Sequence, residues 1–400
     1  MLQHWIWYAM RSGMNDREKL ALLEHFQDPE DIYGASAADY FRAGANKNAA
    51  QSLQDKSLLE AQQVIAQCEE LGIGVVTFGD AQYPSRLKYI ADPPMVLYYK
   101  GKLPDFDSTA VIGVVGTRKA SLYGLNIAQR MGYQISRCGG IMVSGMAAGI
   151  DGAATKGALT AGGNAVGILG CGVDVVYPMS NKMLFSQMEQ YGCLISECLP
   201  GTPAYKWNFP RRNRLISGLS NGVLVAEAPT NSGALSTARQ ALEQGRDVFV
   251  VPGNIDVATC AGSNALLREG AIAVSHGWDI LSEYTHLYGA ALRQCTDEPH
   301  VPKVAQKPLL PAINVEKKPK EKKISIDNGE NVAYSDKNDK LSKLSPEEQK
   351  LLEGLMDGPR FVDDVIADSG MTAGLAKAKL TMLEIRGIIA TLPGGRIALK

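Results

Sequence analysis

The sequence has no excess of either charge: it contains 41 Lys and Arg residues and 42 Asp and Glu residues over 400 positions, for a net charge of -1. The field of the whole chain therefore cannot attract a polyanion, and any such partner must meet a local cluster of cations. The seven cysteines are scattered and never spaced Cys-x-x-Cys, which excludes a zinc ribbon and a disulfide framework and favours reduced thiols.

Long apolar runs are also missing. No run approaches the roughly 18 residues of a membrane span, and Trp5–Tyr8 is too short for the apolar region of a signal peptide. We therefore expect a cytoplasmic protein that does not contact a membrane.

Signatures of nucleotide chemistry are absent as well. There is no Gly-x-x-x-x-Gly-Lys-Ser/Thr motif, which disfavours a P-loop ATPase. Gly170 and Gly172 lack the third glycine of a dinucleotide-binding loop, since Val175 occupies its place. The five histidines all lie away from the Gly-rich loops, so Ser-His-Asp catalysis has no support. We expect no catalytic residue, no metal and no cofactor.

The composition, with 45% hydrophobic and 21% charged residues, is that of a folded α/β protein, and the length allows two or three domains. Residues 1–70 have the apolar spacing of a small helical domain. Residues 71–296 alternate short β-rich runs with Gly-punctuated helical segments, which predicts a Rossmann-like, doubly wound parallel sheet covered on both faces. The runs that predict its strands include Val111–Val115, Ile141–Val143, Ala165–Leu169, Val223–Ala226 and Val248–Val251.

The C-terminal quarter changes character twice. Residues 297–343 hold few large apolar groups and a Lys-rich stretch, Lys317–Lys323, which predicts a flexible linker. Ser345 and Glu348 form a capping box that begins a third domain, 344–400, whose helices and terminal hairpin suggest a winged helix. Its recognition-helix candidate carries a modest charge, so a protein contact and a DNA contact both remain open.

Three Gly-rich loops each follow a predicted strand. They are Gly116–Gly124, Ser144–Gly152 and Asn231–Thr237. Such loops lie at the carboxyl ends of parallel strands and lead into helix N-termini, where exposed N–H groups favour anions. Glycine is also needed simply to turn a strand into a helix, so one loop alone proves little. The three together favour an anion site.

The segment from Tyr205 to Arg214 interleaves cations with aromatic rings. Single-stranded nucleic acid needs both, because cations take its phosphates and rings stack on its unpaired bases. The alternative is a solvated basic turn in which Trp207 or Phe209 fills the core.

From about Leu71 to Tyr284 the chain resembles the DNA-processing protein A family (DprA/Smf). The resemblance rests on ordered motifs: Gly116-x-Arg118-x-x-Ser121-x-Tyr123-Gly124, Gly149-Ile150-Asp151, Tyr177-Pro178, Phe209-Pro210-x-Arg212-Asn213-Arg214, Ser232-Gly233 and Val251-Pro252-Gly253. It implies a SAM-like N-terminal domain, binding of single-stranded DNA without cleavage, a homodimer formed through the Rossmann-like domain, and loading of the RecA recombinase during natural transformation.

The resemblance also implies a DNA pocket. In it, Arg118 would hold one phosphate, Lys206 the next, and Phe209 would stack on a base. The full predicted set is Arg118, Ser121, Ser144, Gly145, Lys206, Phe209, Arg211, Arg212, Asn213, Arg214, Ser232 and Gly233. The chain departs from the family at Ala148 and Thr155, where Arg and His are usual.

Two other functions remain open. Related Rossmann-like enzymes hydrolyse nucleoside monophosphates, and Ser232–Thr237 resembles their loop, but Gln240 stands where that pattern needs a catalytic Glu. Glu197, Glu227 and Asp151 are the possible substitutes. The third hypothesis is a transcriptional regulator that combines the winged helix with a ligand-sensing domain.

Overall fold

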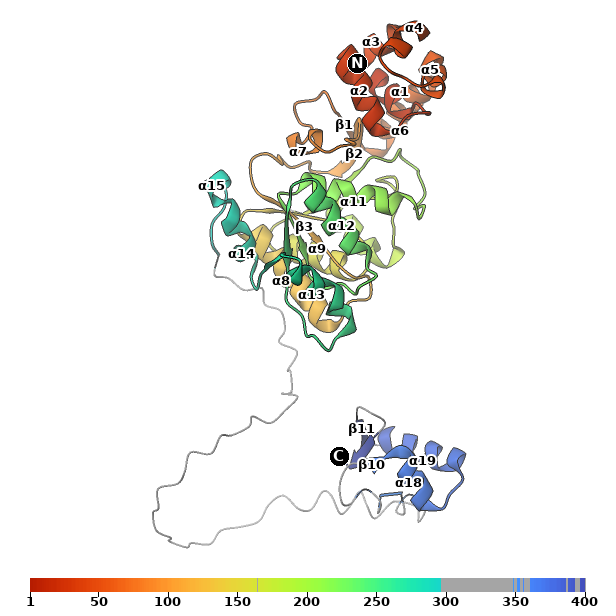
Figure 1. The fold of residues 1–400 in the computed structure, drawn as a ribbon, viewed down its shortest axis with the longest axis vertical. Helices are drawn as coiled ribbons and strands as arrows, with labels where there is room; N and C mark the ends of the chain where they lie inside the picture. Colours follow the sequence, from red (N-terminus) through yellow and green to blue (C-terminus); the bar gives the residue numbers. More distant parts are fainter. Residues whose placement is uncertain are drawn as a thin grey trace. The chain divides into compact units, whose positions relative to one another are not determined.

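The computed structural model describes residues 1–163, 165–295, 348, 351, 352, 355, 360–385, 388–392 and 396–399. The chain divides into two compact units, Met1–Lys307 and Pro308–Lys400 (Figure 1). The predicted linker 297–343 lies outside the described residues. No helix in the described ranges is both long and apolar enough to cross a membrane.

The first unit begins with short helices around an aromatic core. They are α1 (Leu2–Met10), α2 (Asp16–Phe26), α3 (Pro29–Gly34), α4 (Ala37–Arg42), α5 (Lys47–Gln54) and α6 (Leu59–Leu71). Local signals start them: Asn15 and Glu18 form a capping box at α2, and Asp28 caps α3 just before Pro29. Trp7 and Tyr40 are fully buried between the helices, which confirms the predicted helical character of this region.

A nine-stranded sheet follows, in the order β1-β2-β6-β5-β4-β3-β7-β8-β9. β1 pairs antiparallel with β2 and β2 with β6, whereas the remaining neighbours pair in parallel. This confirms the doubly wound, Rossmann-like prediction and adds an antiparallel edge. The strands are β1 (Gly74–Thr77), β2 (Val96–Gly101), β3 (Val111–Val115), β4 (Ile141–Ser144), β5 (Ala165–Ile168), β6 (Cys193–Ser196), β7 (Gly222–Val225), β8 (Asp247–Val250) and β9 (Ile272–Ala273).

Helices cover both faces because the central strands are apolar on both sides. Along β3, Ile112 and Val114 enter one hydrophobic cluster with residues of α8 and α9, while Val111 and Val115 enter another with residues of α11 and α12. The helices are α7 (Ser85–Lys88), α8 (Leu122–Arg137), α9 (Ile150–Thr160), α10 (Lys182–Tyr191), α11 (Asn208–Leu219), α12 (Gly233–Glu243), α13 (Ala261–Arg268), α14 (Gly277–Leu281) and α15 (Thr285–Tyr288), with 3-10 turns at Met179–Asn181, Ala258–Cys260 and Ser282–Tyr284.

The chain reverses its direction across the sheet at β3. From β3 it proceeds through β4, β5 and β6 on one side, and then returns to β7 on the other side of β3. A crevice opens at such a switch point, where the loops after the two strands diverge, and it is where open α/β sheets bind ligands. The Gly-rich loops after β3 and β7 therefore meet at one place.

The second unit has a core of its own, formed by Leu351, Val365, Leu380, Ile389 and Ile397 among others. Its described elements are β10 (Arg360–Phe361), α18 (Val362–Ser369), α19 (Ala373–Ile385), β11 (Ile389–Leu392) and β12 (Arg396–Leu399), and its sheet has the order β10-β12-β11. The second and third predicted helices, α18 and α19, and the terminal hairpin β11–β12 are present, as a winged helix requires, whereas most of the predicted first helix lies outside the described residues. The predicted cap at Ser345 lies outside the described residues.

Candidate nucleic-acid interface

A pocket of about 520 Å³ opens at the switch point between β3 and β7. We call it the switch-point pocket. The loop after β3, the loop after β7, and the N-terminal parts of α11 and α12 form its walls. Its lining residues are Val115–Arg118, Ala147, Asp151, Tyr177, Lys206, Phe209, Pro210, Arg212, Asn213, Ile216, Pro229, Asn231–Ala234 and Thr237.

Two cations stand at this pocket without a carboxylate partner. Arg118 and Lys206 are exposed, and neither makes an ion pair with any residue that the structure describes. Arg118 places its guanidinium carbon 5.4 Å from the centre of the Phe209 ring. An unpaired guanidinium held over a ring keeps its fork of N–H donors available for an anion.

Phe209 is half-buried and anchors the aromatic side of the pocket. Its ring lies 5.2 Å from the ring of Tyr177, centre to centre, and the guanidinium carbon of Arg212 lies 6.0 Å from its centre. A Cβ at position 170 would lie 3.2 Å from the Phe209 ring, so Gly170 leaves the space the ring occupies. Phe209 is thus a fixed ring with access to the pocket.

Glu227 holds the loop that carries Arg118. The Ser121 hydroxyl donates to Glu227 Oε2 at 2.8 Å and the Thr117 N–H donates to the Glu227 carbonyl at 2.8 Å. Ser121 also accepts a bond from the Gly124 N–H at 3.0 Å, which caps α8. Ser121, predicted as a DNA contact, therefore has two structural partners already, and it sets the position of Arg118.

Arg212 lines the pocket, and Gly145, which does not line it, is hydrogen-bonded to Arg212. Arg212 is 4% exposed and donates to the carbonyls of Gly145, at 2.7 Å, and Ile168. The buried carboxylate of Asp151 accepts the Gly145 N–H at 3.1 Å; burial raises the pKa of this carboxyl, and the nearby Arg212 opposes the rise. A Cβ at Gly145 would lie 2.5 Å from Arg212 Nη1. The Gly145 N–H and the Arg212 Nη1 group, predicted here as DNA donors, therefore already have partners within the fold, whereas the buried Arg212 Nε has no hydrogen-bond partner.

Ser144 is likewise buried and donates its hydroxyl to the Val114 carbonyl at 2.7 Å. The family departure at Thr155 lies in the same layer, because Thr155 is fully buried and bonds the Asp151 carbonyl at 2.9 Å. Thr155 thus fills space behind the pocket wall and does not face a ligand.

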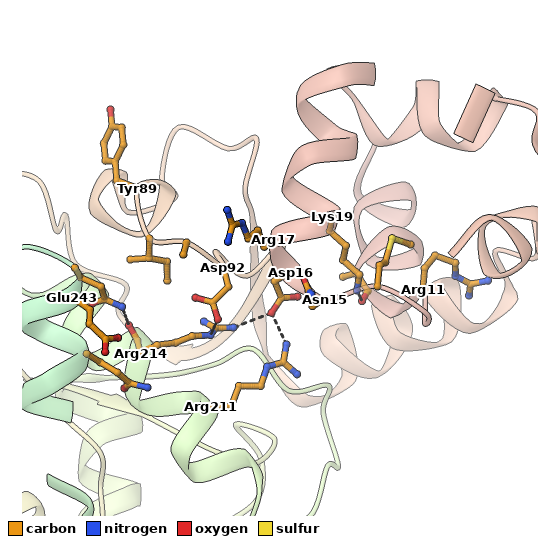
Figure 2. Close-up of a pocket in the computed structure, with 16 residues that line it drawn as sticks. Arg11, Asn15, Asp16, Arg17, Lys19, Tyr89, Asp92, Arg211, Arg214 and Glu243 are labelled. Atoms are coloured by element: carbon orange, nitrogen blue, oxygen red, sulfur yellow. Dashed lines mark hydrogen bonds and ion pairs between the residues drawn. The ribbon is translucent and has the colours of Figure 1, made fainter. Parts of the chain in front are cut away.

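Arg211 and Arg214 lie on the other face of α11 (Figure 2). Arg214 is 4% exposed and pairs with Glu197 at 2.5 Å, with Asp92 at 2.9 Å and with Asp16 of α2 at 3.0 Å. Arg211 reaches the same Asp16 oxygen at 2.6 Å. Grouping these two arginines with Arg118 in one DNA pocket is therefore corrected: carboxylates already neutralise them, and they point away from it.

These pairs border a second pocket of about 1090 Å³, which we call the junction pocket because it lies between the N-terminal helices and α11–α12 (Figure 2). It is larger than the switch-point pocket, yet it lacks the Gly-rich loops. Gln240, which replaces the catalytic Glu of the enzyme pattern, lines the junction pocket and not the switch-point pocket.

The structure also brings in residues that sequence reasoning passed over. Thr117, Asn231 and Thr237 line the switch-point pocket beside Ser232 and Gly233, and Tyr177 stands against Phe209. Their signal was available, since each lies in a Gly-rich loop or in a motif of the resemblance. What the sequence did not show is that Tyr177, from the loop before α10, reaches α11.

Comparison with known proteins identifies the family of the chain. The family model for DNA recombination-mediator protein A matches residues 74–285, and the model for the DprA winged helix domain matches residues 335–395. DNA processing protein DprA of Bacillus subtilis is 40% identical over 245 residues, which are 61% of this chain and 81% of that protein. Protein Smf of Synechocystis is 30% identical over 398 residues, 98% of this chain and 97% of that protein.

The crystal structure of DNA processing protein A from Streptococcus pneumoniae superposes with a TM-score of 0.63 and 32% identity, covering 71% of this chain and 98% of that one. With a family model over more than half of its length and a relative aligned almost end to end, the chain belongs to the DprA/Smf family of DNA recombination-mediator proteins.

Proposed function

We propose that the switch-point pocket binds single-stranded DNA and that the protein is a non-catalytic recombination mediator. The observation that carries this proposal is the unpaired Arg118 held 5.4 Å from the half-buried Phe209 ring, with Lys206 at the same pocket. Arg118 takes a phosphate, Lys206 takes the next, and Phe209 stacks on a base. Asn213, Ser232 and Gly233 supply the remaining polar contacts.

A single strand fits this pocket better than a duplex does. Phe209 is recessed beside Tyr177, so only a base that is unstacked from its neighbours can reach the ring. A paired base inside a helix presents only its edges in the grooves. The pocket therefore reads an open strand through charge and stacking, without reading its sequence.

The pocket is poorly equipped for hydrolysis. Hydrolysis of an N-glycosidic bond needs a free carboxyl group beside the substrate. Asp151 bonds the Gly145 N–H, Glu227 bonds Ser121, and Glu197 pairs with Arg214 on the other side of α11. Each of the carboxylates considered as a substitute for the missing Glu thus has a structural partner, which supports a binding role over an enzymatic one.

Membership of the family extends the proposal to partners. We infer that the protein acts as a homodimer through its Rossmann-like domain and loads RecA onto the bound strand during natural transformation. The test is RecA filament assembly on single-stranded DNA coated with single-strand-binding protein. We expect the wild type to accelerate assembly and Arg118→Ala to fail, whereas equal acceleration by both proteins would separate loading from the pocket.

The direct test of binding is fluorescence anisotropy of labelled oligo-dT and of a matched duplex, with no nucleotide present. Lys119→Ala is the matched control for Arg118→Ala, because Lys119 is an exposed cation of the same loop that does not line the pocket. We expect oligo-dT to bind in preference to duplex, Arg118→Ala to lose the preference, and Lys119→Ala to keep it. Equal loss in both variants would mean that the loop attracts DNA only as a diffuse charge.

A further inference from the structure

A second aromatic pair lies just outside the switch-point pocket. The rings of Tyr205 and Trp207 stack with their centres 4.6 Å apart and their planes 8° from parallel. Trp207 is 69% exposed and Tyr205 43% exposed, and neither lines the pocket. The hypothesis that Trp207 fills the core is therefore wrong for this residue.

Folding does not explain why this pair is exposed. Trp5 and Trp7 are buried in the N-terminal helices, where the surface of an indole ring stabilises a fold. The loop that carries Trp207 is fixed by other groups: Asp174 accepts the Gly201 N–H at 2.9 Å and the Tyr205 carbonyl accepts the Asn208 N–H at 3.1 Å. The two exposed rings thus lie on a loop whose conformation is fixed by other contacts.

The position of the pair relates it to the pocket. Trp207 precedes Phe209 by two residues, and two residues span at most about 7 Å of chain. That length is comparable with one backbone step of an extended single strand. Lys206 lies between Tyr205 and Trp207 in sequence and its side chain lines the pocket. A phosphate held by Lys206 would therefore have one neighbouring base at Phe209 and the other at Trp207.

We propose that the Tyr205–Trp207 pair is a second stacking platform for single-stranded DNA, which binds the base next to the one held at Phe209. This inference rests on the proposed function of the pocket. The occupant is a nucleobase, because the pair adjoins a site with unpaired cations, and an outer face of a large exposed ring stacks on any base without regard to sequence. The platform lengthens the strand that one protein covers.

The experiment compares oligo-dT of increasing length, from a dinucleotide upward, by competition against a labelled long strand. The variants are Trp207→Ala, Phe209→Ala and the control Tyr191→Ala, which removes a 61% exposed ring at the C-terminal end of α10, just before β6 begins. Tyr191 therefore lies near the amino end of β6. The pocket lies at the carboxyl ends of β3 and β7, so the two positions are at opposite ends of the strands of the sheet.

We expect Trp207→Ala to weaken long strands by at least about fivefold, the lower limit for one lost stacked base, and to leave the shortest strands unchanged. Phe209→Ala should weaken strands of every length, and Tyr191→Ala none. The salt dependence should stay constant in Trp207→Ala, and Trp207→Tyr should restore most of the affinity, since it restores a ring.

Other outcomes would overturn the platform. Equal loss at every length would mean that Trp207→Ala distorts the pocket, and no loss at any length would mean that the ring pair does not meet DNA. A fall in molecular mass in sedimentation would assign the pair to a protein contact. If Phe209→Ala and Arg118→Ala lose affinity while Trp207→Ala does not, the second platform is rejected and the proposed function of the pocket stands. If the wild type does not bind oligo-dT, both proposals are rejected.

Discussion

The two pockets on either side of α11 both contain arginines, but the arginines of the junction pocket form ion pairs with carboxylates and Arg118 of the switch-point pocket does not. In the junction pocket, Arg211 and Arg214 meet Asp16, Asp92 and Glu197, so their charges serve the fold. In the switch-point pocket, Arg118 and Lys206 form no ion pair with any described residue, and the buried Asp151 of the same pocket acts on Arg118 only through its charge. The switch-point pocket, although smaller, is thus the better candidate for a polyanion, because anion binding requires cations that are not already in ion pairs and does not depend on volume alone.

The largest effect that this comparison predicts is on stability. Arg214→Ala removes a buried arginine that pairs with Glu197, Asp92 and Asp16, and breaking a buried ion pair destabilises a fold by about 3 to 5 kcal/mol; Arg211, 3.3 Å from Glu197, offsets part of this loss. We expect a large drop in the midpoint of urea unfolding. The protein that remains folded should keep the salt dependence of oligo-dT binding shown by the wild type, and a change in that dependence would break the comparison.

The next effect is on binding. Arg118→Ala should weaken oligo-dT about tenfold, since a charge-assisted hydrogen bond contributes about 1.5 kcal/mol or more. It should also reduce the slope of log affinity against log salt by roughly 0.7, the value for one phosphate contact on a single strand. The urea midpoint should not move. Anisotropy titrations across a salt series measure the first two quantities.

Phe209→Ala sharpens the comparison within the pocket. It removes stacking worth about 1 to 3 kcal/mol and removes no charge, so affinity should fall while the salt slope stays at the wild-type value. A reduced slope would show that the ring positions Arg118, which lies over it. Phe209→Trp is the companion variant and should retain the affinity.

A smaller effect concerns a cation that packs against rings. Burial lowers the pKa of Lys56 to about 8, and its ammonium lies over the rings of Trp7, Tyr33 and Tyr40. Between that pKa and the ordinary value of 10.5, the unfolded chain binds more protons than the folded one. Stability should therefore rise with pH in this window, by less than about 1.4 kcal/mol per pH unit. The difference in urea midpoint between wild type and Lys56→Met, followed from pH 7 to 10, isolates this contribution.

The smallest effect is expected at Arg211. Its side chain is 56% exposed and pairs with Asp16 at 2.6 Å and with Glu197 at 3.3 Å; because Arg214 remains a partner for both carboxylates, we expect a loss of about 1 kcal/mol. Arg211→Ala should lower the urea midpoint slightly and leave oligo-dT binding and its salt slope unchanged. A slope reduced as much as in Arg118→Ala would place Arg211 on the DNA and remove the distinction between the two faces of α11.

The sequence was sufficient for the five parallel strands β3, β4, β5, β7 and β8, the three Gly-rich loops and the basic aromatic segment, because each has a local signal, but not for the antiparallel edge β1-β2-β6. The short apolar runs and the Gly-rich loops after them located these strands, and parallel pairing brings the carboxyl ends of the strands together. The direction of each arginine in α11 has no local signal. Arg214 faces Asp16, Asp92 and Glu197, which come from three distant parts of the chain, and only the folded arrangement shows that they converge.

The same limit applies to the donors of the second loop. Ser144 and Gly145 have the composition of a phosphate-binding loop, yet Val114 and Asp151 accept their bonds. Small residues at a strand end serve close approach of any kind, and here the approaching group is the Arg212 side chain. The composition predicted the close approach of an anion to this loop, whereas the group that approaches Gly145 in the structure is the Arg212 side chain.

The ends of the sheet bear on self-association. β1 and β9 form its two edges and are four and two residues long. Edge strands this short offer few unpaired backbone groups to another chain, which protects the fold from strand-by-strand aggregation. A homodimer of this protein therefore has little to gain from joining two sheets into one, and its interface should be built from side chains on the helices and loops.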